Sequence, residues 1–119
     1  MNLFPGKYIS IIDFKKGWNL VQQKVHEMAK EKGFWDEVKN VGEMIALMHS
    51  ELSEALEAQR FGNQASEHIP EYNGLEEELA DLVIRVMDMA EGLGLRVAEA
   101  ILAKIEFNQG REHKHGKQF

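Results

Sequence analysis

The chain has no cysteine, only two prolines and no long run of apolar residues. The absence of cysteine excludes disulfide bonds and thiolate metal sites, and it is typical of proteins from a reducing compartment. The N-terminus lacks a basic region followed by a long apolar stretch, so the sequence predicts neither a signal peptide nor a membrane span. We therefore expect a cytoplasmic protein without a membrane partner.

Basic residues are also comparatively few, since 14 lysines and arginines face 20 acidic residues and the formal net charge is −6. This balance argues against electrostatic capture of DNA, RNA or an anionic membrane. A small phosphorylated ligand stays open, because a bound metal ion reverses the sign of the charge locally. With 119 residues, 44% of them apolar, the chain is expected to form a single packed domain over residues 1–119.

Apolar residues recur at three- and four-residue steps, a spacing that predicts helices. Polar N-cap residues precede the periodic segments at Asp13, Asn40 and Asn73, and a glutamate follows three residues after each asparagine, at Glu43 and Glu76. The predicted fold is all-α, most simply a four-helix bundle. The expected segments are an N-terminal arm (1–12), four helices (13–33, 40–62, 73–94 and 95–109) and a basic C-terminal tail (110–119).

Two acidic pairs at helical spacing stand out: Glu51 with Glu54, and Glu78 with Asp81. Side chains three residues apart share one face of a helix. Glu51 falls within the apolar face of its helix and Glu54 at the edge of that face, where a carboxylate needs a partner, a proton or a metal ion. Four converging carboxylates would repel one another unless a hard cation such as Mg²⁺ lay between them. For the second pair alone, a solvated charged face is the alternative.

Three polar residues of the last helix, Lys104, Asn108 and Arg111, follow one another at i, i+4 and i+7 and therefore lie on one side of it. Cations and an amide donor in this arrangement are suited to phosphate oxygens. The alternative is a solvated basic helix end that complements the helix dipole. Trp35 is a further candidate, for stacking on a nucleobase, and His26 is a candidate site residue; core or surface packing is the alternative for both.

Taken together, these motifs resemble those of the MazG-like superfamily of all-α nucleoside triphosphate pyrophosphohydrolases. The likeness runs from about residue 33 to the C-terminus. It rests on the two acidic motifs, which are separated by 23 intervening residues, and on the basic last helix. The matching residues are Glu51-Leu-Ser-Glu54, Glu78-Leu-Ala-Asp81, Lys104, Asn108, Arg111 and His115-Gly116-Lys117. The resemblance implies a small single-domain MazG fold, assembled as a homodimer or as a dimer of dimers.

The resemblance also implies an activity, the hydrolysis of a (deoxy)nucleoside triphosphate to the monophosphate and pyrophosphate with Mg²⁺, or with Mn²⁺ as a substitute. In that interpretation both acidic pairs bind the metal ion, and Glu54, with Glu51 as the other catalytic candidate, serves as general base toward water. Lys104, Asn108 and Arg111, together with Lys117, would contact the phosphates. Trp35 and His26 would contact the base. The whole set comprises Glu51, Glu54, Glu78, Asp81, Lys104, Asn108, Arg111, Lys117, Trp35 and His26.

One position departs from the family pattern. Relatives that discriminate sharply between bases often carry an aromatic residue one turn after the last motif acid, and here that position is Arg85. Two other functions stay open on the residues alone. The acidic strips would also suit a non-catalytic helical module that pairs with a protein partner. A di-iron carboxylate site is disfavoured, because neither acidic helix carries the Glu-x-x-His pair typical of that class.

Overall fold

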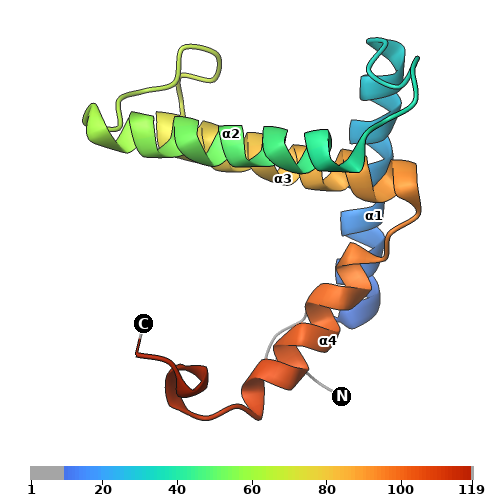
Figure 1. Ribbon diagram of the computed structural model, residues 1–119, viewed down its shortest axis with the longest axis vertical. Helices are drawn as coiled ribbons and strands as arrows, with labels where there is room; N and C mark the ends of the chain where they lie inside the picture. Colours follow the sequence, from blue (N-terminus) through green and yellow to red (C-terminus); the bar gives the residue numbers. More distant parts are fainter. Residues whose placement is uncertain (1–9, 119) are drawn as a thin grey trace.

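The computed structural model describes residues 10–118, which form four long helices and one short 3₁₀ helix (Figure 1). β-pairing among these residues is limited to an isolated bridge between Ala65 and Asn73. The predicted all-α class is therefore confirmed. The helices are α1 (Ile11–Glu31), α2 (Val41–Arg60), α3 (Gly74–Leu93), α4 (Val97–Gln109) and η1 (His113–Gly116).

Side-chain caps fix the first residues of three helices. The side chains of Asn40 and Asn73 accept hydrogen bonds from the third backbone N–H of α2 and α3, as predicted. At α3 the Glu76 side chain also accepts from the backbone N–H of Asn73, which completes a capping box. The predicted cap of α1 was wrong by one turn: Ser10 is the N-cap, and Asp13 donates its backbone N–H to the Ser10 hydroxyl.

The structure shifts the predicted N-terminal boundary and confirms that the last helix ends at residue 109. The expected N-terminal arm ended at residue 12, whereas Ile11 and Ile12 already belong to α1, because the Ser10 cap starts the helix earlier; residues 1–9 lie outside the described part. Helix α4 ends at Gln109, so Arg111 follows it in a turn and does not extend the helical face of Lys104.

Helices α2 and α3 run side by side in opposite directions and form the main packing unit, which α1 crosses near the C-terminal end of α3 (Figure 1). Helix α4 packs on α1 and leads away from the α2–α3 pair. The carboxylate motifs, one on α2 and one on α3, are thereby placed against each other. The last helix is placed apart from them.

A connection of residues 61–73 joins α2 to α3 and is held by its own hydrogen bonds. The buried Ser66 hydroxyl accepts from the backbone N–H groups of His68 and Ile69, and donates to Glu77 of α3 at 2.7 Å. The Asn63 side chain accepts from the backbone N–H of Leu75 at 2.8 Å. These contacts fix the position of α3 relative to the end of α2.

The single chain leaves much apolar surface in solvent. Its accessible area is 9196 Å², whereas a compact monomer of 13.6 kDa would expose about 6,600 Å². The radius of gyration is 16.9 Å, against roughly 13.5 Å for a compact domain of this length. Within the described residues, no helix is both long and apolar enough to cross a membrane.

Candidate functional site

Three carboxylates from the two central helices converge. Oxygen atoms of Glu51 and Glu54 on α2 and of Glu78 on α3 lie within 4.8 Å of one another. Glu51 is buried, with 7% of its surface exposed, Glu78 is half-buried, and Glu54 is exposed at the rim. Three oxygen ligands at this spacing form a group that could hold a metal ion. We call these three residues the carboxylate cluster.

The local sequence explains why the cluster faces inward. Ala55, one turn after Glu51, is buried with 5% exposure, and its small side chain lets α2 approach its neighbour closely. Helix α3 presents Glu78 one turn before Leu82, which is half-buried. The acids therefore lie on the packed faces of both helices, as the helical spacing predicted for Glu51.

Two oxygen atoms of the cluster are buried without a hydrogen-bond partner among the described residues: Oε2 of Glu51 and Oε2 of Glu78. An unpartnered buried carboxylate oxygen is costly, because folding removes it from water and supplies nothing in return. Native proteins leave few such atoms, and a ligand that is not part of the polypeptide is one of the reasons. This observation separates the cluster from an ordinary solvated acidic surface.

The other oxygen of Glu51 is occupied. Arg85 of α3 donates its Nε–H to Oε1 of Glu51 at 2.8 Å. Burial raises the pKa of Glu51, but the hydrogen bond and the positive charge of Arg85, together with the neighbouring carboxyl groups, outweigh this effect and leave the pKa below its ordinary value. Glu51 is therefore held ionised, and its Oε1 is bound by the guanidinium.

Glu78 shows the opposite electrostatic response. Burial, reinforced by the neighbouring carboxyl groups of Glu54 and Glu51, raises its pKa to about 7. Asp81 lies outside the group of three, but burial and the charge of Glu51 raise its pKa as well. Without a cation, the cluster thus retains a proton near neutral pH, since closely spaced carboxylates cannot all ionise freely.

The structure does not bring the predicted phosphate-binding residues to the cluster of the same chain. Lys104 and Arg111 both lie over the ring of Phe107, at 4.6 Å and 5.5 Å from its centroid, on the helix that leads away from α2 and α3. Asn108 has a buried Oδ1 without a hydrogen-bond partner among the described residues. Lys117 is exposed after the short 3₁₀ helix.

The two predicted base-contacting residues do come together. The imidazole of His26 and the indole of Trp35 meet edge to face, with centroids 4.8 Å apart. Both bind Oδ1 of Asp88 on α3, His26 through Nδ1 at 2.8 Å and Trp35 by donating Nε1–H at 2.9 Å. Asp88 follows Asp81 by two helical turns, so this aromatic group lies further along the same strip of α3.

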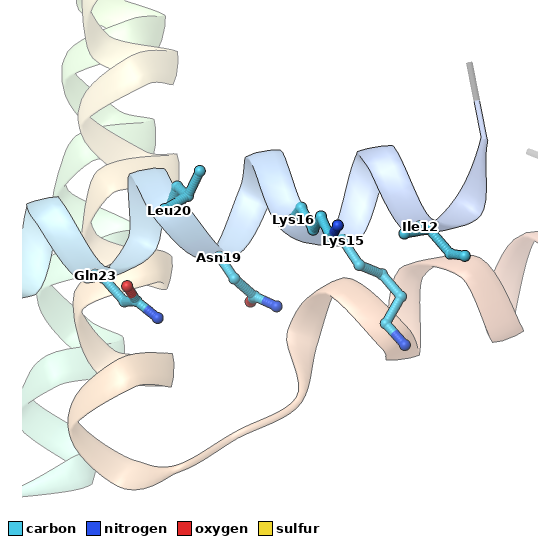
Figure 2. A pocket seen from close by; sticks show the side chains of 6 residues that line it. All are labelled: Ile12, Lys15, Lys16, Asn19, Leu20 and Gln23. Carbon is cyan, nitrogen blue, oxygen red and sulfur yellow. The ribbon is translucent and has the colours of Figure 1, made fainter. Parts of the chain in front are cut away.

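A groove along α1 is separate from all of these residues. It measures about 470 Å³ and is lined by side chains from successive turns of α1 (Figure 2). Its lining is basic and amide-rich with two apolar flanks: Ile12, Lys15, Lys16, Asn19, Leu20 and Gln23. None of the predicted site residues contributes to it.

Sequence reasoning missed two partnerships. It treated Arg85 only as a departure from a family pattern, although the structure shows it as the cation bound to Glu51. It did not single out Asp88, which the structure links to His26 and Trp35. The spacing of Asp81, Arg85 and Asp88 at four and three residues places them on one helical face and could have marked them as a group, although it does not identify their partners on other segments.

No protein-family model, curated protein or solved structure matches this chain. The geometry of the carboxylate cluster and of the groups around it is therefore the basis for proposing a function.

Proposed function

We propose that the protein is a Mg²⁺-dependent nucleoside triphosphate pyrophosphohydrolase that removes unwanted nucleotides from the cytoplasmic pool, as the MazG-like resemblance of its motifs suggests. The observation that carries the proposal is the carboxylate cluster, with buried and unpartnered oxygens on Glu51 and Glu78. A set of oxygen donors without histidine or cysteine suits hard cations such as Mg²⁺ and Mn²⁺. The residues present therefore fit the ion that the proposed reaction requires.

We assign each residue a role from its burial and its charged neighbours. Glu51 and Glu78 would bind the ion through their free oxygens, and Asp81 adds negative charge at the edge of the site. When bound, such a cation neutralises phosphate oxygens and makes a water nucleophile available at neutral pH. Glu54, which is exposed beside Glu51 and Glu78, would accept a proton from water at a carboxylate oxygen.

The group of His26, Trp35 and Asp88 supports a base-binding role, because it continues the strip of α3 beyond the cluster. Glu78, the residue that α3 contributes to the carboxylate cluster, precedes Asp88 by ten residues, which corresponds to a rise of about 15 Å along the helix. We infer a loose base preference, since Arg85 replaces the aromatic residue that the resemblance leads one to expect.

We further infer that the chain works as a homo-oligomer, a dimer or a dimer of dimers. Helix α2 carries an apolar stripe at i, i+7 and i+11, formed by Ile45, Leu52 and Leu56, and each of these residues is more than 40% exposed. The surplus accessible area relative to a compact monomer, roughly 2,000 Å² or more, is of the size that obligate dimers bury.

The direct test is a screen of nucleoside triphosphates with Mg²⁺, in which pyrophosphate and orthophosphate are measured separately. Pyrophosphate release from at least one nucleotide is expected. The Glu51→Gln variant should lose activity by at least about 100-fold, because the ion loses a charged ligand.

Glu57→Gln is the matched control, since it makes the same substitution at an exposed position of the same helix. It should retain full activity. Release of orthophosphate alone, absence of turnover with every nucleotide, or normal turnover by the Glu51→Gln protein would contradict the proposal. Absence of turnover together with no response to Mg²⁺ would instead favour the non-catalytic module in which the acids pair with a protein partner.

A further inference from the structure

Arg85 occupies an unusual position beside the carboxylate cluster. Its Nε–H is used in the hydrogen bond to Oε1 of Glu51, and its side chain is 40% exposed although its partner is only 10% exposed. Because Glu51 belongs to the cluster, the guanidinium adjoins any ion held by the free oxygens of Glu51 and Glu78. The guanidinium is thus fixed on one edge and open on the other.

A guanidinium carries five N–H donors, and only one of them is used here. Glu51 is the single hydrogen-bond partner of Arg85 within residues 10–118. An arginine that served only as counter-ion to a buried carboxylate would gain more from a side-on pair of hydrogen bonds to both oxygens. Instead, among the residues that the structure describes, Oε2 of Glu51 has no hydrogen-bond partner and the two Nη groups of Arg85 have no acceptor.

The basic residues predicted to bind phosphate do not reach this position in the same chain, because Lys104 and Arg111 lie against Phe107 on α4. Among the described residues, Arg85 of α3 is the cationic side chain that is hydrogen-bonded to the cluster. A planar pair of Nη donors matches two oxygens of a phosphate, and the buried Glu51 carboxylate prevents the side chain from rotating away.

We propose that Arg85 is a substrate-binding residue, whose Nη groups hold the phosphate oxygens of a polyphosphate ligand while Glu51 fixes its orientation. The proposal rests on the proposed function and adds to it a residue at a position where the resemblance leads one to expect an aromatic side chain. It also assigns two tasks to Glu51, one for each carboxylate oxygen: Oε1 orients the guanidinium, and Oε2 serves the metal ion.

The experiment measures two affinities of the full-length protein by calorimetry: Mn²⁺ alone, and inorganic tripolyphosphate in the presence of saturating Mg²⁺. Arg85→Met should bind Mn²⁺ as tightly as the unaltered protein or more tightly, because a neighbouring positive charge is removed. The same variant should bind tripolyphosphate at least about tenfold more weakly, because two charge-assisted hydrogen bonds are lost. The proposal thus predicts that Arg85→Met leaves Mn²⁺ affinity unchanged or raises it, and lowers the affinity for tripolyphosphate.

Two further variants sharpen the comparison. Arg85→Lys keeps the charge but not the planar fork, and should still weaken tripolyphosphate binding by roughly threefold or more. It also serves if Arg85→Met does not fold. Arg60→Met, which removes an arginine from the exposed C-terminal end of α2, is the matched control and should leave both affinities unchanged.

Unchanged or tighter tripolyphosphate binding by Arg85→Met would overturn the proposal and leave Arg85 as a counter-ion only. Binding by Arg85→Lys equal to that of the unaltered protein would overturn the role of the fork. If the unaltered protein binds neither Mn²⁺ nor tripolyphosphate, the proposed function fails together with this inference, whereas intact binding without an Arg85 effect defeats the inference alone.

Discussion

The indole ring of Trp35 lies directly against the backbone of Gly92 in the last turn of α3. A Cβ atom at position 92 would overlap ring atoms of the indole, so glycine is what lets the loop after α1 close onto α3. The ring cannot simply turn away, because Nε1–H is bound to Asp88 and the ring edge contacts His26.

Gly92→Ala should destabilise the protein. Displacement of Trp35 costs about 1–3 kcal/mol, which exceeds the gain of roughly 1 kcal/mol from replacing glycine by alanine inside a helix. Urea denaturation followed by tryptophan fluorescence measures the change. Gly17→Ala in α1 is the control: a Cβ there meets no atom within 4 Å, and this variant should be slightly stabilised. Equal behaviour of the two variants would show that Trp35 does not pack as described.

Mg²⁺ or Mn²⁺ should raise the melting temperature, because a ligand that binds only the folded state stabilises it by about 2.7 kcal/mol at 100 times its dissociation constant. Glu51→Gln and Glu78→Gln should each reduce this response strongly, since each removes a charged cluster ligand. The exposed Glu57→Gln variant should respond like the unaltered protein. A response that survives both cluster substitutions would place the cation elsewhere.

In the absence of divalent cations, the free energy of unfolding should fall as the pH rises from 5 to 8. Burial and the neighbouring carboxylates raise the pKa of Glu78 to about 7, whereas the unfolded chain releases this proton near the ordinary glutamate pKa. The folded state therefore holds the extra proton between these two pH values, and it is stabilised least above the higher one. Asp81, whose pKa is also raised, acts in the same direction.

Glu78→Gln tests that assignment, because glutamine is neutral at every pH and should remove most of the decline. Chemical denaturation at several pH values gives the comparison. Conversely, stabilisation by Mn²⁺ should be larger at pH 8 than at pH 5.5, since the ion then has no proton to displace. Identical pH profiles for the two proteins would show that Glu78 does not carry the shifted proton.

The exposed stripe of α2 should be an interface. Light scattering is expected to give at least twice the chain mass of 13.6 kDa for the unaltered protein, and the chain mass for Leu56→Lys. A lysine at that position would place a charge within the apolar contact. Glu57→Lys changes the neighbouring residue and should leave the assembly intact, while a monomeric unaltered protein would refute the interface.

The sequence predicted the helices well where local signals were strong. Asn40 and Asn73 begin their helices as expected, because an N-cap acts through residues three positions away. The start of α1 was wrong because Ser10 and Asp13 are both good caps, and only the structure shows which of them accepts the hydrogen bond. Glu51 was correctly expected to face the core, since the apolar periodicity of α2 surrounds it.

Contacts between distant segments were less predictable. The pairing of Arg85 with Glu51 spans 34 positions and depends on how α2 and α3 align, which no local pattern encodes. The divergence of α4 from the cluster follows from its packing on α1, although Lys104 has the right spacing to Asn108 for a phosphate site. The metal-binding, phosphate-binding and base-binding roles stay predictions.

The hydrogen bonds around Ser66 have a consequence for how this protein would tolerate change. They set the alignment of α2 and α3 from a segment that contains no candidate ligand. A substitution there would slide one helix along the other and separate Glu51 from Glu78 without touching either. Mutational scans should therefore find positions in this connection at which substitutions abolish function, although none of these residues belongs to the cluster.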